Sequence, residues 1–514
     1  MSGAAEQEIA ALLSQPASYG EPGATVDRLD TQASLIFLVG ARAFKMKRAG
    51  AFSYLDYSTL ALRKRYCEAE LERGRHLAPM LYRRLHAVTR EQDGRLMLNG
   101  AGEPVEWLLE MRRFDQGALF DRLAEIACLT PVLMRDLADE IAEFHRAAEV
   151  AHDRGGSTAL SALIQDIEAN LGRAGRLLDA NAVSTLKNAQ ASALGRLAPL
   201  LDRRRAVGKV RRCHGDLHLR NICLIDSKPT LFDPIEFSDE LAMIDVLYDL
   251  AFLLMDLHHR GHDELGNRVL NRYLDRTEDQ GGLAALPLFL SLRAGIRAHV
   301  TAAAEMRQCS AEKAGDLAEE SGAYLALAIE LLTPRAPRLI AIGGLSGTGK
   351  TSLAHALAPV LGPVPGARIL RSDVLRKRSL GVSPETRLPG AAYEPAVSER
   401  AYLMLSEEAA ETIAAGYAVL ADAVFLRPDE RQAIGEVARL KGIAFTGLWL
   451  EAAPEVLARR IERREHDASD ATVAVMRRQT TLDSGPIAWH RIDAGGRIER
   501  TAEEARAILA AEAT

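Results

Sequence analysis

Acidic and amide residues gather around a short polar stretch near the middle of the chain. Residues 212–223 read RCHGDLHLRNIC, in which Asn221 follows five positions after Asp216. A second aspartate, Asp233, lies twelve residues beyond Asn221 in the segment LFDPIEF. A tight loop can turn Asp216 and Asn221 toward one point, and oxygen atoms of carboxylates and amides are the ligands that Mg²⁺ accepts. The spacing therefore predicts a catalytic base, Asp216, beside a metal site formed by Asn221 and Asp233.

Two histidines flank this candidate base. His214 opens the motif, and we expect it to support the loop through a hydrogen bond. His218 either contacts a phosphate group of a substrate or is simply exposed, and its position in the sequence favours neither role.

Basic residues upstream could neutralise phosphate groups. In the segment ARAFKMKR, Ala43 and Lys45 share one face of an expected strand, where the alanine leaves room for adenine and the lysine reaches phosphates. Lys47 shares that face and is the rival of Lys45. Glu70, in the helical pattern that follows, is the expected partner of the lysine, with Glu68 as the second choice. A base, metal ligands, a lysine and a carboxylate that aims the lysine are what phosphoryl transfer requires.

A glycine-rich motif appears in the C-terminal part of the chain. GLSGTGKT, at residues 344–351, fits G-x-x-x-x-G-K-[ST] at every defined position. In this motif backbone N–H groups surround phosphate oxygens, the lysine reaches the β- and γ-phosphates, and the hydroxyl binds Mg²⁺. The apolar segment LIAIGG precedes the motif and the helical segment TSLAHALAPVL follows it, as the motif requires. The expected nucleotide contacts are Gly344, Ser346, Gly347, Thr348, Gly349, Lys350, Thr351 and Ser352, and Thr351 is also an expected metal ligand.

Polar residues after this motif are candidates for acting on the phosphate. Asp373 ends the strand-like segment ARILRSD, and strand carboxyl ends face the ligand crevice in an open α/β sheet. It is a candidate base for an acceptor hydroxyl, or alternatively the N-cap of a helix. Arg376 could hold an anionic substrate, and Asp422, in the strand-like segment 417–425, could hold Mg²⁺ through water.

An arginine-rich segment, PEVLARRIERREHDASDA, follows the next strand-like segment, 442–452. Its arginines are candidates for a lid over the transferring phosphate, although a solvated helix face is favoured for any one of them. The four arginines are Arg459, Arg460, Arg463 and Arg464, of which Arg459 and Arg463 are the chosen candidates.

The elements that must position these residues fall into two expected domains, 1–332 and 338–514. TPRAPR, at the boundary, has two prolines that end a preceding helix. The second domain alternates strands with helices, which predicts an α/β fold with a parallel sheet. The first begins with strands and continues with helices, which predicts an α+β bilobal fold. The segment Glu110–Phe114, including Met111, is the expected hinge between its lobes, where backbone groups bind adenine.

Several expected elements in the first domain can be located along the chain. After the polar stretch, ICLI-DSKP-TLFDPI predicts a hairpin. The remaining expected elements are strands at 34–40, 41–48, 94–100 and 104–114, a helix over Thr59–Leu85, one long helical region from about 117 to 205, and mainly helix over 240–332.

The motifs together resemble known families. HGDLHLRN resembles the H-x-D-x-x-x-x-N catalytic loop of the aminoglycoside phosphotransferase family, a branch of the protein-kinase-like fold. This resemblance implies that Asp233 is the counterpart of the kinase DFG aspartate and that Asp249, in Asp-Leu-Ala, supports the catalytic loop. No G-x-G-x-x-G precedes Lys45, so the segment Asp30–Ser34 is the expected phosphate cover.

The C-terminal half resembles small P-loop kinases, a group that includes gluconate kinase, chloramphenicol phosphotransferase and zeta toxin. Both halves in this order resemble a bacterial fusion family described as bifunctional aminoglycoside phosphotransferase/ATP-binding proteins. The resemblance implies a protein that uses ATP and Mg²⁺ to phosphorylate small molecules at an alcohol group, with a sugar-like acceptor favoured. A nucleotide-binding regulator and an aminoglycoside-resistance enzyme are the alternatives.

Composition and charge limit the partners and the cellular location that we expect. The chain has 514 residues and a formal net charge of −6, so it offers no broad basic field for nucleic acid. Its five cysteines form no CxxC pair, which favours reduced thiols. The N-terminus lacks a signal-peptide pattern, and the most apolar run, Leu247–Leu257, is too short and too acidic to span a bilayer. We therefore expect a cytoplasmic protein with small-molecule substrates and no membrane or nucleic-acid partner.

Overall fold

The computed structural model describes residues 3–31, 33–51, 55–174, 177–305, 311–463 and 468–512. The chain forms two compact units. The first unit comprises Met1–Ala159 and Asp202–Leu253, and the second comprises Leu160–Leu201 and Leu254–Thr514. The expected boundary between residues 332 and 338 lies inside the second unit.

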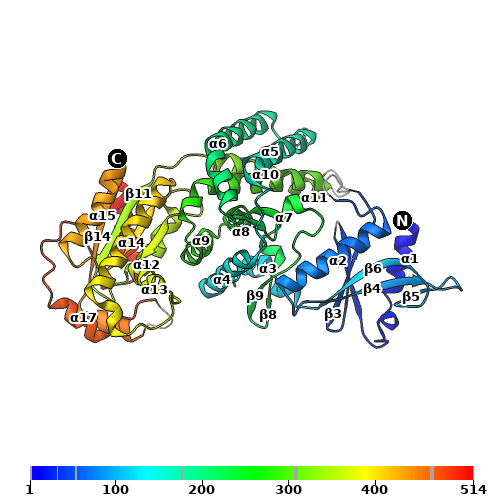
Figure 1. Cartoon of the computed structure of the whole chain (residues 1–514), viewed down its shortest axis with the longest axis horizontal. Coiled ribbons are helices and arrows are strands. Elements are labelled where there is room, and N and C mark those ends of the chain that lie inside the picture. The colour runs from blue at the N-terminus through cyan, green and yellow to red at the C-terminus, as the bar shows by residue number, and fades with distance from the viewer. Residues whose placement is uncertain are drawn as a thin grey trace. The chain divides into compact units, whose positions relative to one another are not determined.

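The first unit is built on a six-stranded antiparallel sheet of order β1-β2-β3-β6-β4-β5, seen in blue in Figure 1. Helix α2 (Leu60–Leu77) packs against β4 and β6. Helix α1 (Gly3–Leu13) contributes Ile9 and Leu13 to a core beneath Phe37 and Phe44. The strands are β1 (Val26–Asp30), β2 (Ser34–Val39), β3 (Arg42–Lys47), β4 (Tyr82–Arg90), β5 (Leu96–Leu98) and β6 (Glu103–Arg112).

The rest of the first unit carries the polar stretch. Short strands β7 and β10 pair with each other, and β8 pairs with β9 in the expected hairpin. The elements are α3 (Phe120–Glu125), α4 (Pro131–Ala147), β7 (Val210–Arg212), β8 (Ile222–Ile225), β9 (Lys228–Leu231), α7 (Asp239–Ala242), β10 (Met243–Asp245) and the start of α8 (Val246–His259).

Two sequence-based expectations for this region were wrong. The helix expected over Thr59–Leu85 ends at Leu77, and β4 follows, because Pro79 comes directly after the C-cap residue Ala78 and cannot extend the helix. The long helix expected from 117 to 205 is instead four helices, α3 to α6. Thr130 caps a new helix that begins with Pro131, and Gly155 has a positive φ of 70°.

The second unit contains a five-stranded parallel sheet of order β12-β13-β11-β14-β15. Along the central strand β11, Ile340 and Ile342 join one apolar core, while Leu339 and Ala341 join another. Both faces of the strand are therefore buried, as its continuous apolar sequence predicts. The strands are β11 (Arg338–Gly344), β12 (Arg368–Arg371), β13 (Val419–Asp422), β14 (Ala444–Glu451) and β15 (His490–Asp493), the last of which was not predicted.

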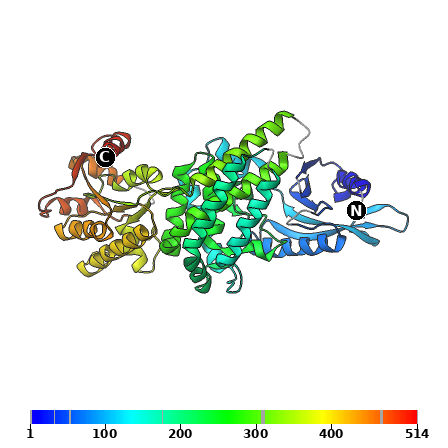
Figure 2. The same ribbon diagram turned by 90° about the horizontal axis from the view of Figure 1, so that it is seen from above.

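Helices surround this sheet and continue into a helical bundle within the same unit. Figure 2 shows the bundle helices in teal and green lying side by side. The bundle helices are α5 (Gly156–Arg173), α6 (Ala180–Ala206), α9 (Asp263–Thr277), α10 (Leu286–Glu305) and α11 (Ala311–Glu330). The others are α12 (Lys350–Leu357), α13 (Ser372–Ser379), α14 (Pro395–Ala414), α15 (Pro428–Lys441), α16 (Pro454–Glu462), α17 (Val473–Thr480) and α18 (Ile498–Ala511).

One stretch of the described residues, Gln280–Glu305, is long and apolar enough to cross a membrane by length and composition. Its mean hydropathy is 1.3, and 67% of the apolar window is buried inside the protein. Such burial is typical of a core helix, and α10 packs extensively against α11.

Candidate active sites

The first candidate site is centred on the loop between β7 and β8. Asn221 donates from Nδ2 to the backbone oxygen and to Oδ2 of Asp216, both at 2.9 Å. Gly215 has a φ of 83°, a conformation that glycine adopts without strain, so the loop can turn sharply just before Asp216. The expected pair of catalytic base and metal ligand is thus brought together, and the Asp216 carboxylate remains partly exposed.

Helix α8 supports this loop through the side chain of Asp249. The fully buried carboxylate of Asp249 accepts hydrogen bonds from the backbone N–H groups of His214 and Gly215, at 3.0 and 2.8 Å, and lies 3.1 Å from Nε2 of His145. A carboxylate that accepts several hydrogen bonds fixes the groups around it. This is the supporting role that the Asp-Leu-Ala resemblance implies for Asp249.

His214 is a structural part of the loop. Burial lowers the pKa of its imidazole, so the ring is neutral near pH 7. Its Nε2 lies 2.8 Å from the Phe232 carbonyl, and its Nδ1 lies 3.3 Å from the Asp216 N–H group. A neutral ring that donates from Nε2 and accepts at Nδ1 satisfies both contacts.

His218 packs with its ring edge toward Phe252, with 5.0 Å between ring centroids, and its Nε2 lies 3.4 Å from Oδ2 of Asp216. The side chain is therefore largely buried next to the candidate base. The structure thus places it within the site and excludes full exposure, one of its two expected positions.

The β8–β9 hairpin returns the chain from Asn221 to Asp233. The Phe232 N–H group donates to the Asn221 carbonyl at 3.0 Å, which holds the two metal-ligand candidates at the same end of the hairpin. Asp233 has a φ of 61°, and its N–H group donates to the Tyr82 hydroxyl at 2.8 Å. A positive φ in a residue other than glycine is strained and is common at functional sites.

Lys45 contacts its expected partner, Glu70, and also the metal-ligand candidate Asp233. Its Nζ lies 2.8 Å from Oε1 of Glu70 and 2.5 Å from Oδ1 of Asp233. Burial alone would lower the pKa of Lys45, but the carboxylates of Asp233 and Glu70 raise it well above its usual value. Glu68, the second choice of partner, pairs instead with Lys64 on the surface of α2.

Lys47 has a different set of contacts. Its Nζ lies 2.6 Å from Oε2 of Glu70, 2.5 Å from Oε1 of Glu236 and 3.1 Å from the Tyr57 hydroxyl. Lys47 is only 1% exposed, whereas Lys45 reaches the partly exposed Asp233. Each lysine thus pairs with a different oxygen of the Glu70 carboxylate. Of the two, Lys45 is the one next to a metal-ligand candidate.

An apolar cluster lies on β3 and β6, close in sequence to Lys45. Ala43 and Met111 are directly opposite each other on β3 and β6, and both join a cluster with Leu38, Ile225 and Phe232. This places the expected adenine pocket and the expected hinge next to each other. The expected phosphate cover, Asp30–Ser34, forms the turn between β1 and β2, and Gln32 within it lies outside the described residues.

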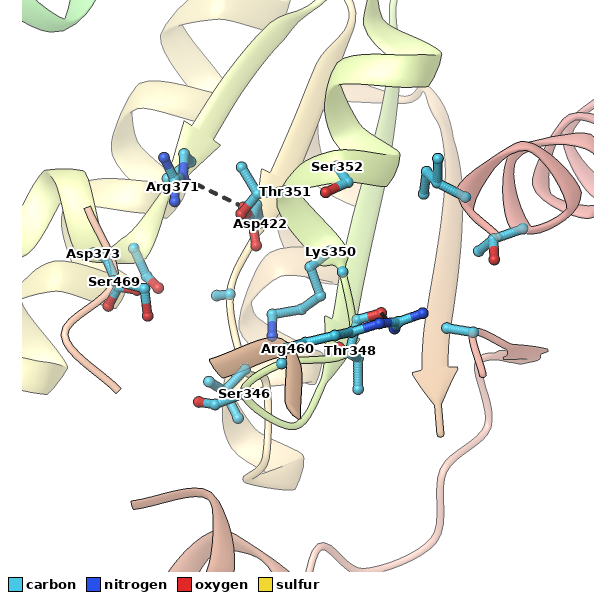
Figure 3. Close-up of a pocket in the computed structure, with 18 of the residues that line it drawn as sticks. Ser346, Thr348, Lys350, Thr351, Ser352, Arg371, Asp373, Asp422, Arg460 and Ser469 are labelled. Atoms are coloured by element: carbon cyan, nitrogen blue, oxygen red, sulfur yellow. Dashed lines mark hydrogen bonds and ion pairs between the residues drawn. The ribbon is translucent and has the colours of Figure 1, made fainter. Parts of the chain in front are cut away.

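The second candidate site is a pocket of about 410 Å³ at the carboxyl ends of the parallel strands (Figure 3). The glycine-rich loop connects β11 to α12, and Gly347 and Gly349 have φ values of 89° and 94°. Lys350 donates from Nζ to the carbonyls of Gly344 and Leu345, at 2.9 and 3.0 Å. The residues of the loop that line the pocket are Ser346, Gly347, Thr348, Gly349, Lys350, Thr351 and Ser352. Gly344, two positions before Ser346, is not among the lining residues.

The two metal-ligand candidates of this site are in contact. The Thr351 hydroxyl donates to Oδ2 of Asp422 at 2.5 Å, and Nε of Arg371 lies 3.5 Å from the same oxygen. Burial raises the pKa of the Asp422 carboxyl, while Arg371 and Lys350 oppose the rise. A hydroxyl and a buried carboxylate beside a phosphate-binding loop are a donor set that suits Mg²⁺.

Asp373 lines the same pocket as Ser469 (Figure 3). Arg371 is the N-cap of α13, so Asp373 lies two positions inside the helix and is not its N-cap. Its Oδ1 accepts from Nη1 of Arg376 at 3.0 Å. The Arg376 guanidinium is buried and lies over the Tyr393 ring, 4.7 Å from its centroid. Asp373 therefore lines the pocket, whereas the buried Arg376, which contacts Asp373, is not among the residues that line it.

The arginine-rich segment is placed differently from the expected lid. Arg459 and Arg463 are exposed and do not line the pocket, so the choice of these two was wrong. On α16 the neighbouring position faces the site instead. Arg460 lines the pocket, and its guanidinium donates to the carbonyls of Thr348 and Gly496, at 3.3 and 2.8 Å. Arg464 lies outside the described residues.

Sequence reasoning missed Arg371, Glu236 and Tyr57 as members of the two sites. Arg371 could have been found, because it immediately precedes the Ser372–Asp373 segment at a strand end. Glu236 is three residues beyond Asp233, but its role depends on Lys47, which is 189 positions away in the sequence. No local pattern reveals such a pair.

Comparison with known families finds similarity in two segments of the chain. Residues 64–286 match the model described as "Phosphotransferase enzyme family", and residues 339–482 match the model described as "AAA domain". An uncharacterized protein of Mycobacterium tuberculosis (strain H37Rv) and one of Mycobacterium bovis are each 27% identical over 492 residues. Each alignment covers 93% of this chain and 94% of the relative.

Solved structures similar to this chain fall into two groups. A choline/ethanolamine kinase family protein from Mesorhizobium loti is 14% identical and covers 63% of this chain and 95% of its own, with a TM-score of 0.40. A gluconokinase from Sinorhizobium meliloti 1021 is 24% identical and covers 34% of this chain and 93% of its own, with a TM-score of 0.25. The chain thus combines one segment that is similar to a phosphotransferase enzyme family with a later segment that is similar to an AAA domain.

Proposed function

We propose that the protein is a bifunctional phosphotransferase in which each domain moves the γ-phosphate of ATP to a hydroxyl group of a small, sugar-like metabolite. One observation supports this most directly. In each domain a lysine, a pair of metal-ligand candidates and a carboxylate base are brought together from separate elements. The contacts between these groups in the first site are Lys45–Asp233 and Asp216–Asn221. In the second site they are Thr351–Asp422 and Asp373–Arg376.

In the first site Asp216 would orient the acceptor hydroxyl and take its proton. Because Asn221 donates from Nδ2 to Asp216, its amide oxygen is the atom suited to a metal, together with the Asp233 carboxylate. Glu70 holds Lys45 where it can reach phosphate oxygens. The Mg²⁺–ATP complex supplies the phosphoryl group and neutralises the charge that develops during transfer.

In the second site the glycine-rich loop and Lys350 would bind the phosphates, and Thr351 and Asp422 are the suited metal ligands. Asp373 would take the proton of the acceptor hydroxyl. Arg376 lies against Asp373 and would hold a polar or anionic group of the acceptor. Arg460, which bridges the loop to Gly496, would close one side of the nucleotide pocket.

The experiment is to incubate the full chain with [γ-³²P]ATP, Mg²⁺ and a pool of hydroxyl-bearing metabolites. We expect labelled products, with Asp216→Asn and Asp373→Asn each lowering one product by about 10²- to 10⁴-fold. Asp226→Asn, in the β8–β9 turn, and Asp429→Asn, at the start of α15, are matched exposed controls that should retain labelling. If no labelled product forms, and neither active-site variant changes ATP consumption, the proposal is wrong.

A nucleotide-binding regulator is the second candidate for the first domain. The turn between β1 and β2 contains no glycine, so its backbone cannot wrap phosphates as closely as a glycine-rich loop does. This candidate predicts an ATP–Mg²⁺-dependent rise in melting temperature that Lys45→Ala removes, without any labelled product from that site.

An aminoglycoside acceptor has less support. Such polycations need an acidic cleft, but five acidic side chains between residues 239 and 264 each form an ion pair with a basic side chain of the protein. The pairs are Asp239–Arg212, Glu240–Arg154, Asp256–Arg260, Asp263–His258 and Glu264–Arg268. Efficient phosphorylation of kanamycin would reverse this ranking. A metabolic role would place the protein in the cytoplasm.

A further inference from the structure

Strand β12 forms one edge of the parallel sheet in the second unit. It pairs with β13 from Arg368 opposite Val419 to Arg371 opposite Asp422. An edge strand has backbone N–H and C=O groups without a strand partner on its outer side. Its carboxyl end leads directly into Arg371 and Asp373, which line the second pocket. Contacts on the outer side of β12 therefore also fix one wall of the second site.

Two asparagines of helix α9 occupy this outer side. Asn267 and Asn271 are four residues apart and so lie on one helix face. Both donate from Nδ2 to the carbonyl of Ala367, at 3.0 and 3.1 Å. The N–H group of Ile369 donates to Oδ1 of Asn271 at 2.7 Å. The Asn271 carboxamide thus bonds to residues 367 and 369, as a residue of a parallel neighbouring strand would.

The contacts around these asparagines are buried. Asn267 is 1% exposed, Asn271 is 5% exposed and Arg368 is 1% exposed. Arg368 donates from Nη1 to the backbone oxygen and to Oδ1 of Asn271, at 3.1 and 3.2 Å, and its Nη2 lies 2.6 Å from Oδ1 of Asp275. Because water does not replace a hydrogen bond lost in such a place, each bond constrains the strand strongly.

The two elements come from the two matched domains. Helix α9 lies within residues 64–286, the phosphotransferase-family segment, and β12 lies within residues 339–482, the P-loop segment. Both belong to the same compact unit. Arg272 of α9 also pairs with Glu385 at 2.9 Å, beyond the end of α13. The sheet edge of the P-loop domain is thus completed by a helix of the phosphotransferase-family domain.

We propose that Asn267 and Asn271 are positioning residues of the second active site, which hold β12 so that Arg371 and Asp373 face the nucleotide pocket. This inference rests on the proposed function of that site. It adds that the positions of Arg371 and Asp373 in the P-loop domain depend on α9. The P-loop domain therefore needs α9 for full activity, which is a physical reason for the fusion of the two domains.

Two substitutions at position 271 separate hydrogen bonding from packing. Asn271→Asp keeps an oxygen that accepts from the Ile369 N–H group and from Arg368. Asn271→Leu keeps a similar volume but removes every polar contact of the side chain. Both are made in the full chain with Lys45→Ala, so that ATP turnover reports on the second site. Arg268→Ala, which removes the ion pair between Arg268 and Glu264 on the same helix, is the control.

We expect Asn271→Leu to lower kcat for ATP turnover at the second site by about 10-fold or more, with KM for MgATP within about twofold, because misplaced groups reduce rate more than binding. Hydrogen exchange should become faster in residues 367–373 and stay unchanged in β13. Asn271→Asp keeps the acceptor of the Ile369 N–H group but loses the donor to Ala367, so its loss of rate and of protection should be smaller than that of Asn271→Leu. If Asn271→Leu does not fold, Asn267→Ala should show a smaller change in the same direction, because Asn271 still donates to Ala367.

The inference is overturned if Asn271→Leu matches Arg268→Ala in rate and in hydrogen exchange, or if the leucine variant is active while the aspartate variant is not. The second result would show that packing alone matters. Failure of the proposed function is a different result. In that case the Lys45→Ala chain neither binds nor turns over MgATP, while hydrogen exchange in residues 367–373 still reports whether α9 holds β12.

Discussion

At the residue scale, the first site contains an alternating set of buried charges. Asp233, Lys45, Glu70, Lys47 and Glu236 contact one another in this order. Burial costs each charge its hydration, and close opposite charges on both sides offset that cost. The set connects β3, helix α2 and the segment after β9, so it holds the candidate phosphate-binding lysine and a candidate metal ligand in fixed positions.

Removing the charge of Glu236, at the buried end of this set, should lower the free energy of unfolding. Glu236→Gln leaves the 1%-exposed Lys47 with one carboxylate fewer, and we expect a loss of about 3 kcal/mol in the free energy of unfolding. Chemical denaturation of the full chain measures the loss. The control is Glu168→Gln, which breaks the exposed Lys187–Glu168 pair and should cost at most about 1 kcal/mol. Equal losses in the two variants would show that the buried set does not stabilise the site.

Sequence patterns predicted most residues of the two sites but not their supports. Asp216, Asn221 and the glycine-rich loop are recognisable because their chemistry depends on local spacing. Glu236 was missed because its role depends on Lys47, which approaches it only in the folded chain. The choice of Arg459 and Arg463 instead of Arg460 was wrong because the segment does not show which helix face meets the loop.

At the element scale, strand and helix types were predicted better than their ends. The β8–β9 hairpin and the strand–loop–helix around residues 344–351 were confirmed, since apolar runs and glycine turns define them. Helix α2 was extended too far because the charged, amphipathic sequence of β4 also fits a helix. The contact between α9 and β12 could not be predicted, because it joins residues about one hundred positions apart.

His299, in helix α10, should make the free energy of unfolding depend on pH. Burial lowers the pKa of His299 to about 4, below its usual value of 6.5. The unfolded chain therefore binds a proton more readily than the folded chain between these pH values. Stability should be complete above pH 6.5 and decline as the pH falls toward 4, by up to about 1.4 kcal/mol for each pH unit.

Melting temperatures at pH 7 and pH 5 test this expectation. His299→Gln removes the titrating group, so its melting temperature should fall less between the two pH values than that of the natural chain. An equal fall in both proteins would show that His299 does not contribute to acid sensitivity.

At the scale of the whole molecule, the chain combines two different scaffolds, to each of which we assign a phosphotransferase site. The first uses an antiparallel sheet, a loop supported by Asp249 and a hairpin that carries Asp233. The second uses a glycine-rich loop and the carboxyl ends of parallel strands. In both, backbone geometry positions a lysine and oxygen ligands where a triphosphate and Mg²⁺ would meet. The account therefore requires two nucleotide sites in each chain.

Equilibrium binding of the non-hydrolysable nucleotide AMPPNP with Mg²⁺ to the full chain tests this requirement most directly. We predict two nucleotides bound per chain, with Lys45→Ala and Lys350→Ala each removing one of them and the double variant removing both. A folded chain that binds fewer than two nucleotides, or in which either lysine can be removed without loss of a site, would contradict the account.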